Sequence, residues 1–177
     1  MIKIIVLIIS LFIGNNISYE FVDIQINENV ANFEKMYKKY NYFNDEYIDD
    51  ISIKLNKYLN STLKDKGYFI ARYSIDSNVD PYLVTAVMLQ ETGCYWTCSK
   101  LVRNCNNVAG NKGKPSCGSG SYRKFDTIEE GIQFAINKLA WYYNNGLTTP
   151  ERIGPKYAGD PNWSTKVNKY INKLKNA

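Results

Sequence analysis

The sequence contains no histidine, and this absence restricts the chemistry that the protein can perform. Without imidazole, catalysis by Ser-His-Asp or Cys-His groups is excluded, and so is every zinc hydrolase that uses imidazole ligands. Acid–base chemistry must then come from Asp, Glu, Tyr, Lys or Cys. Internal repeats and low-complexity linkers are also lacking. The composition, 45% hydrophobic and 22% charged, is typical of a globular protein, and 177 residues are enough for one domain with a hydrophobic core.

Only residues 1–18 hold a marked apolar run, and no other stretch is long enough to cross a membrane. Lys3 precedes the run from Ile4 to Ile13, and about ten apolar residues are too few for a spanning helix, which needs about 20. This pattern predicts a signal peptide. No cysteine lies near its end, which argues against a lipid anchor. We expect an exported bacterial protein, secreted or cell-wall associated, that contacts a membrane only through an uncleaved signal segment.

The four cysteines lie within one short segment, at Cys94, Cys98, Cys105 and Cys117. In an oxidising compartment this pattern predicts two disulfides, and the sequence leaves all three pairings open. A four-cysteine zinc site is the alternative. The spacings of three, six and eleven intervening residues contain no Cys-x-x-Cys knuckle, which favours disulfides. We therefore predict no metal site, and a segment braced by its cysteines.

Charge is divided unevenly along the chain, whose formal net charge is +5. Residues 20–50 hold eight acidic side chains and three lysines, whereas residues 51–177 hold 18 basic and nine acidic side chains. A basic domain attracts polyanions. For an exported protein an anionic cell wall is a better candidate than nucleic acid, and solvated surface lysines are the alternative interpretation. We expect a monomer without a nucleic-acid partner.

Apolar residues at three- and four-residue steps predict a mainly α protein. Asp80 and Pro81 open the most apolar helix as N-cap and first residue. Thr127 and Glu130 form a capping box, and Gly67 is interpreted as the end of an earlier helix. Residues 94–124 read as an irregular, cysteine-braced lobe with a small hairpin. The predicted helices cover residues 30–42, 44–66, 68–75, 80–92, 127–144, 149–157 and 160–174.

Glu91 lies at the C-terminal end of the most apolar predicted helix, where a carboxylate is out of place. The partial negative charge of a helix C-terminus repels it, and apolar neighbours disfavour its ionised form. A carboxylic acid that stays protonated near neutral pH can donate a proton to a leaving oxygen. We interpret Glu91 as a candidate general acid, and a surface glutamate in a frayed last turn is the alternative. The other carboxylates considered lie at helix starts, where acidic caps belong: Asp80, Asp126, Glu129, Glu130 and Asp160.

Five motifs follow one another in an order that resembles a known family. The apolar helix ends in Glu91-Thr92-Gly93, and Thr97-Cys98-Ser99-Lys100 and Asn106-Asn107-Val108-Ala109-Gly110 come next. The aromatic stretch from Tyr122 to Thr127 leads into a helix, and the match closes with Tyr157-Ala158, Asp160-Pro161 and Trp163-x-x-x-Val167. Over roughly residues 54–175 the chain resembles lysozyme-like peptidoglycan hydrolases, above all the bacterial glucosaminidases (glycoside hydrolase family 73-like).

The resemblance implies a lysozyme-like α+β domain with a small irregular lobe. It also implies an enzyme that cleaves β-1,4 glycosidic bonds in peptidoglycan strands, as an N-acetylglucosaminidase, without a cofactor. By this resemblance Glu91 is the general acid, and Tyr157 lines the cleft beside it. The resemblance also implies four substrate-binding residues. Asn107 and Gly110 would form the floor of the cleft below the sugar whose bond is cleaved. Tyr122 and Phe125 would stack on or border sugar rings, and core packing is the alternative for these two aromatics.

One departure from the family affects the reaction type. The family often places a second carboxylate after the Asn-Asn turn, but residues 112–123 contain no acid. Enzymes of this fold with a single glutamate can act as lytic transglycosylases, in which a hydroxyl of the sugar attacks. A muramidase, a non-catalytic cell-wall-binding module and a secreted factor that binds a protein are further alternatives. The predicted organisation is a signal peptide (1–18), an acidic N-terminal extension (19–50) and a lysozyme-like glucosaminidase domain (51–177).

Overall fold

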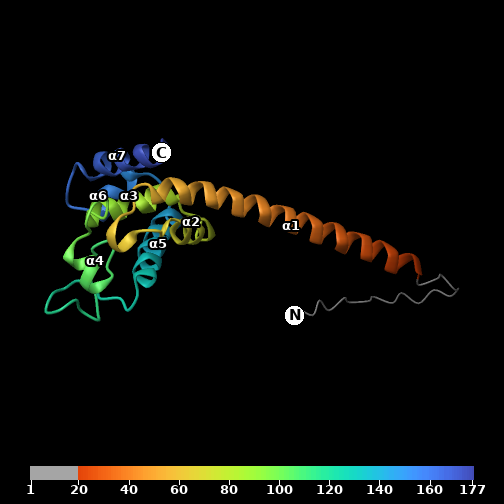
Figure 1. Ribbon diagram of the computed structural model, residues 1–177, viewed down its shortest axis with the longest axis horizontal. Helices are drawn as coiled ribbons and strands as arrows, with labels where there is room; N and C mark the ends of the chain where they lie inside the picture. Colours follow the sequence, from red (N-terminus) through yellow and green to blue (C-terminus); the bar gives the residue numbers. More distant parts are fainter. Residues whose placement is uncertain (1–19) are drawn as a thin grey trace. The chain divides into compact units, whose positions relative to one another are not determined.

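The computed structural model describes residues 20–177, and the signal peptide predicted over residues 1–18 lies outside them. Within the described residues the chain is mainly helical (Figure 1). No helix there combines the length and the apolar character that crossing a bilayer requires. The elements are α1 (Glu20–Asn56), the 3-10 helix η1 (Ser61–Leu63), α2 (Gly67–Asp76), α3 (Pro81–Thr92), α4 (Lys100–Cys105), α5 (Ile128–Asn144), α6 (Pro150–Tyr157) and α7 (Trp163–Lys175).

The chain divides into two compact units, residues 1–42 and residues 43–177. Of the first unit, the structure describes the helical backbone from Glu20 to Tyr42. The helix predicted over residues 30–42 is therefore confirmed, but it belongs to the longer α1. The second unit contains the end of α1, where Ile48 is fully buried, and every other element. All features described below belong to this second unit.

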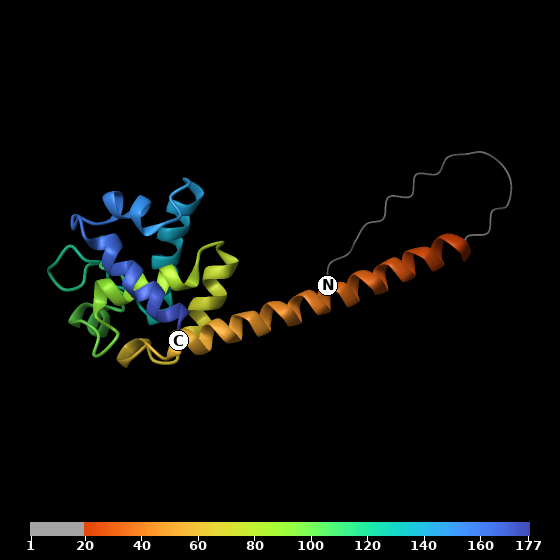
Figure 2. The ribbon, with the colours of Figure 1, turned by 90° about the horizontal axis from the view of Figure 1, so that it is seen from above.

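Helix α3 occupies the centre of the second unit and packs against α7, α2 and α5 (Figures 1 and 2). Its predicted ends are confirmed. Asp80 Oδ1 accepts a hydrogen bond from the backbone N–H of Tyr82 at 2.8 Å, Pro81 is the first helical residue, and Gly93 ends the helix in the left-handed conformation, with φ of 66°. Every residue of α3 is buried or half-buried except Glu91. An all-round apolar helix is a buried one, as the sequence indicated.

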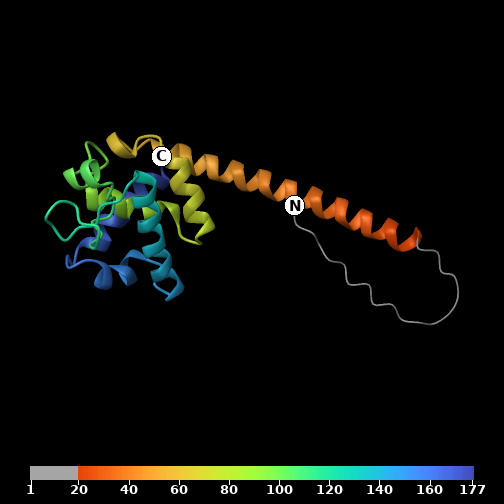
Figure 3. The same cartoon turned by 90° about the horizontal axis from the view of Figure 1, so that it is seen from below.

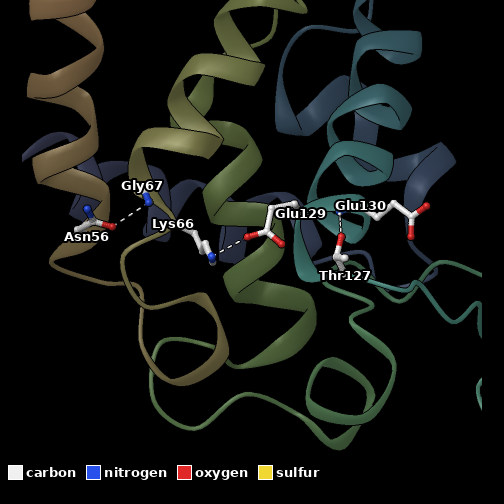
Figure 4. Close-up of polar contacts among 6 residues, drawn as sticks. All are labelled: Asn56, Lys66, Gly67, Thr127, Glu129 and Glu130. Atoms are coloured by element: carbon white, nitrogen blue, oxygen red, sulfur yellow. Dashed lines mark hydrogen bonds and ion pairs between the residues drawn. The ribbon is translucent and has the colours of Figure 1, made fainter.

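Gly67 begins α2 instead of ending the preceding helix, so this prediction was wrong. Helix α1 already ends at Asn56, whose Oδ1 accepts a hydrogen bond from the Gly67 N–H at 2.8 Å (Figure 4). A Cβ at position 67 would lie 2.6 Å from Asn56 Oδ1 and 2.6 Å from the backbone oxygen of Ser52. Glycine is therefore required here because α2 starts in direct contact with α1.

The start of α5 is held by the predicted capping residues (Figure 4). Thr127 Oγ1 accepts a hydrogen bond from the Glu130 N–H at 3.1 Å, while Glu130 Oε2 accepts one from the Asp126 N–H at 2.9 Å. Beside them, Lys66 Nζ lies 2.6 Å from Glu129 Oε1 and links the segment before α2 to α5. These contacts fix the orientation of α5, which forms one wall of the cavity described below.

Residues 94–127 contain little regular structure apart from α4 (Figure 2). Helix α4 was not predicted; Ser99 caps it by accepting a hydrogen bond from the Val102 N–H. The expected α+β character is limited, within the described residues, to two isolated bridges, Lys112 with Tyr122 and Ser116 with Arg123. The predicted disulfides form between Cys94 and Cys98 and between Cys105 and Cys117.

Helix α7 begins at Trp163, three residues after the predicted start at Asp160. The difference arises because Asp160 Oδ1 accepts a hydrogen bond from the Asn162 N–H at 2.9 Å and so stabilises a turn before the helix. The end of α7 lies beside the last turns of α1, where Lys54 Nζ donates a hydrogen bond to the backbone oxygen of Lys175 at 3.2 Å (Figure 3). Helix α6 begins at Pro150, as the sequence predicted.

Candidate active site

Glu91 is the one exposed residue of the central helix α3 and lies in its last turn. The sequence predicted an apolar environment, but the structure places Glu91 at the surface, next to the indole of Trp163. Trp163 Nε1 donates a hydrogen bond to Glu91 Oε1 at 2.8 Å. Since Trp163 is buried, with 2% of its surface exposed, the indole is a fixed donor and orients the carboxylate.

The second carboxylate oxygen of Glu91 faces Gly110. A Cβ built on Gly110 would lie 3.9 Å from Glu91 Oε2 and 3.9 Å from Tyr122 Cε1. Gly110 has a φ of 61°, in the left-handed region that favours glycine. The absence of a side chain thus leaves space between the carboxylate and the exposed Tyr122 ring. Gly110 and Tyr122, both predicted substrate-binding residues, therefore lie around Glu91.

Asn107 stabilises the turn that carries Gly110. It is fully buried, and its Nδ2 donates hydrogen bonds to the backbone oxygens of Asn111 at 2.8 Å and Arg123 at 2.7 Å. Its Oδ1 accepts a hydrogen bond from the Asn111 N–H at 2.9 Å. With three bonds to backbone groups, the side chain fixes the turn that carries Gly110. Asn107 thus shapes the floor of the site without being exposed to a ligand.

A cavity of about 760 Å³ has Gly110 and Tyr157 in its wall, and Glu91 lies next to it across Gly110 without lining it. Its size falls within the range of about 300–1,000 Å³ that is usual for small-ligand sites. The Tyr157 ring lies 4.9 Å from the Trp163 ring, which in turn holds Glu91. The lining combines aromatic, amide and lysine side chains: Gly110, Asn111, Lys112, Phe134, Asn137, Lys138, Trp141, Tyr142 and Tyr157.

Tyr157 is half-buried at the end of α6, and its hydroxyl donates a hydrogen bond to the backbone oxygen of Ala109 at 3.5 Å. Burial raises the pKa of Tyr157 well above its usual range, and the charge of Glu91 and the neighbouring Tyr142 act in the same direction. The phenol therefore stays neutral across the physiological pH range. It offers a neutral, oriented hydroxyl group close to Glu91.

Comparison with known protein families shows which family the chain belongs to. Residues 67–176 match the family model Glucosaminidase, described as mannosyl-glycoprotein endo-beta-N-acetylglucosaminidase. The chain belongs to this family. A comparison with curated protein sequences finds no match. The protein is therefore a glycoside hydrolase, and its family indicates peptidoglycan as the material on which it acts. The matched glucosaminidase region begins at the first residue of α2 and includes α3, the cavity and α7.

In this glucosaminidase, Lys138 of α5 lies in the wall of the cavity. It differs in this from the solvent-exposed lysines of the surface. It is half-buried, its Nζ lies 4.2 Å from the centre of the Tyr157 ring, and it donates a hydrogen bond to Asn111 Oδ1 at 3.4 Å. Burial lowers the pKa of Lys138, while the negative charge of Glu91 acts in the opposite direction. The cavity thus contains a fixed cation near the carboxylate.

The remaining predicted residues make other contacts. Phe125 is 4% exposed, and its ring lies 5.2 Å from that of Phe134, so it packs in the glucosaminidase interior behind the cavity wall. Asp126, the nearest acid after Glu91 in the sequence, is exposed before α5 and is not among the cavity-lining residues. The disulfide between Cys94 and Cys98 begins three residues after Glu91, and the one between Cys105 and Cys117 spans the Gly110 turn.

Sequence reasoning missed several residues of the site. The sequence indicates Trp163 only as a residue of the closing motif, although an indole there is a reasonable hydrogen-bond donor to an acid. Trp141, 59% exposed in the cavity wall, belongs to the aromatic run that ends α5, and this run is a signal that could have found it. Lys138 gave no signal, because a lysine on an amphipathic helix looks like any solvated one.

Proposed function

We propose that this glucosaminidase is exported and cleaves β-1,4 glycosidic bonds in the glycan strands of peptidoglycan, as an N-acetylglucosaminidase with Glu91 as general acid. The family match supports the bond type and the substrate class. The two disulfides are compatible with an oxidising compartment outside the cytoplasm, and the excess of basic residues beyond position 50 suits an anionic wall. The secreted or wall-associated location follows from the same features.

The observation that carries the proposal is the way Glu91 is held. Trp163 donates its N–H to Oε1, so the proton of the neutral acid belongs on Oε2, the oxygen that faces the open space beside Gly110. A glycosidic oxygen in this space would take that proton as its bond to the anomeric carbon breaks. The leaving sugar then carries the new hydroxyl group, and positive charge develops on the remaining sugar ring.

The cavity beside Glu91 supplies the surfaces that a sugar chain requires. Phe134, Trp141, Tyr142 and Tyr157 provide aromatic faces, and Asn111 and Asn137 provide amide groups. This combination of a mostly apolar lining with a few polar groups is the usual composition of a ligand site. The negative charge of Glu91 acts on Tyr157, and we assign to its neutral hydroxyl and its ring the stabilisation of the charge on the reacting sugar. The lysozyme-like arrangement expected from the resemblance agrees with this placement of acid and cleft.

Lytic transglycosylation is the second candidate, and one observation favours it. Residues 112–123, where the family often places a second carboxylate, contain no aspartate or glutamate. A hydrolase of this type normally uses a second carboxylate to activate water. Without one, a hydroxyl of the substrate itself can attack the anomeric carbon and leave an anhydro sugar. A muramidase differs only in which of the two alternating bonds enters the site.

Glu91→Gln tests the proposal, with Glu46→Gln as the matched control, because Glu46 is an exposed glutamate in α1. We expect Glu91→Gln to lower the rate of digestion of purified peptidoglycan by about 10²–10⁴-fold, the usual contribution of a general acid, and Glu46→Gln to have no effect. Digestion by Glu91→Gln at the wild-type rate would overturn the role of Glu91. Mass spectrometry of the products then separates the candidates: reducing N-acetylglucosamine, reducing muramic acid or 1,6-anhydro ends.

A further inference from the structure

Lys138 is a half-buried cation that forms no ion pair with the side chains that the structure describes, those of residues 30–36 and 45–177. The carboxylates that form ion pairs there do so with other cations, and none lies within 4 Å of Lys138 Nζ. Its contacts are the face of the Tyr157 ring and Asn111 Oδ1. The charge of Glu91 acts on Lys138 without forming an ion pair with it, and burial outweighs this effect, so the free-energy cost of removing the ammonium from water is only partly offset. A structural lysine in such a place would normally be paired, which suggests that the anion comes from a ligand.

The environment of Lys138 reinforces this interpretation. The cavity is lined by two lysines, Lys112 and Lys138, and by no acid among the described residues. Asn111, 3% exposed, also lines it, and its Nδ2 has no hydrogen-bond partner within the part of the chain described by the structure. A ring and an amide oxygen hold the ammonium in place, so little conformational freedom would be lost when it binds an anion.

We propose that Lys138 is a specificity-determining residue that binds a carboxylate carried by the glycan strand beside the bond that Glu91 cleaves. This inference rests on the proposed function. In peptidoglycan every second sugar bears a lactyl ether, whose carboxylate is free where the stem peptide has been removed and is an amide where the peptide remains. The stem peptide carries carboxylates of its own, further from the sugar ring. A cation fixed in the sugar-binding cavity favours the carboxylate closest to the ring.

The test compares three glycan ligands that differ in this group: peptide-free strands with free lactyl carboxylates, the same strands with those carboxylates converted to primary amides, and strands that keep their stem peptides. Binding is measured in the Glu91→Gln background, so that no ligand is consumed. We expect the carboxylate strands to bind at least about tenfold more tightly than the amide strands, as befits a hydrogen bond to a charged group. Tighter binding of the peptide-bearing strands would identify a stem-peptide carboxylate as the ligand instead.

Three substitutions in the same background assign the preference to this residue. Lys138→Met keeps the apolar stem and removes the charge, and it should abolish the preference for carboxylate over amide. Lys138→Arg should retain the preference. Lys57→Met removes one positive charge from an exposed position outside the cavity and should retain it as well. An equal loss of affinity for both ligands in Lys138→Met would mean a structural role and overturn the proposal.

The outcome is separable from that of the proposed function. If the wild-type protein cleaves no glycan but prefers carboxylate strands through Lys138, the proposed enzymatic activity is refuted and the proposed binding site is supported. If wild type cleaves peptidoglycan and carboxylate and amide strands bind equally, the enzyme stands while the role of Lys138 is refuted. Failure of every strand to bind overturns this inference.

Discussion

Trp163 Nε1 donates a hydrogen bond to Glu91 Oε1 at 2.8 Å, and this bond joins residues 72 positions apart in the chain. It connects the first turn of α7 to the last turn of α3, the central helix. Gly154 of α6 makes room for the indole, because a Cβ there would lie 3.2 Å from Trp163 Cε3. The candidate general acid is thus oriented by a residue that belongs to the C-terminal helix.

Trp163→Phe removes the donor and keeps an aromatic ring in the buried position. We expect turnover of peptidoglycan to fall by about 10–100-fold, because Glu91 becomes charged as it gives up its proton, and a hydrogen bond to a charged group is worth about 1.5–3 kcal/mol. The measurement is kcat on a soluble glycan. Trp96→Phe is the control, since Trp96 is 77% exposed and outside the site. A similar decrease in both variants would show that the indole of Trp163 has no specific role.

Local capping chemistry made much of the second unit predictable. The caps of α3 and α5 act on backbone groups within a few residues, and the apolar pattern of residues 82–89 identifies a buried helix without reference to the rest of the chain. Glu91 was found for the same reason, because it breaks a preference that is local to its own helix. The family resemblance then placed Tyr157 and Gly110 near it.

Contacts between distant segments were beyond this reasoning. Gly67 looks like a helix terminator in the sequence, and only the approach of α2 to Asn56 shows that it begins a helix. Phe125 and Tyr122 look alike in the sequence, but one packs on Phe134 and the other is exposed. The charge environment of Lys138 depends on side chains from three segments and leaves no trace in a linear pattern.

Gly131→Ala should destabilise the protein. A Cβ at this position in α5 would lie 1.8 Å from the backbone oxygen of Asn106, whose side chain also donates hydrogen bonds to the backbone oxygens of Phe125 and Asp126. Overpacking of this kind costs about 1–3 kcal/mol, more than the helix propensity that alanine adds. Denaturant unfolding measures the change. Gly159→Ala is the matched control, since nothing lies within 4 Å of its Cβ, and its effect should stay within about 0.5 kcal/mol. Equal stability of the two variants would contradict the contact.

The two disulfides should contribute unequally to stability. Cys105 and Cys117 are 12 positions apart, and Cys94 and Cys98 are four apart. The chain-entropy relation gives about 3 kcal/mol for the longer loop and about 2 kcal/mol for the shorter one. Replacing Cys105 and Cys117 together by alanine should therefore lower the free energy of unfolding more than replacing Cys94 and Cys98. Because the longer loop contains Asn107 and Gly110, its loss should also reduce activity. Equilibrium unfolding of the two double variants measures the order, and the reverse order would refute the expectation.

The ion pair between Lys66 and Glu129 should make stability depend on pH in one direction. The hydrogen bond from Lys66 lowers the pKa of Glu129, with help from a backbone hydrogen bond, and partial burial opposes the shift. A carboxyl whose pKa is lower in the folded than in the unfolded protein stabilises the fold above its unfolded pKa, about 4.3, and loses this effect as pH falls through the folded value. The stabilisation is therefore complete at neutral pH.

Glu129→Gln should accordingly cost stability at pH 7 and approach the wild type in acid. The cost should stay below about 1 kcal/mol, because both side chains are partly exposed, by 32% for Lys66 and 38% for Glu129. Denaturant unfolding at neutral pH and below about pH 4 measures the difference. Lys66→Met and the double variant complete a double-mutant cycle. The cycle separates the free energy of the ion pair from the favourable effect of an acid in the first turn of α5. A cost of Glu129→Gln that does not change with pH would show that the pair adds nothing to stability.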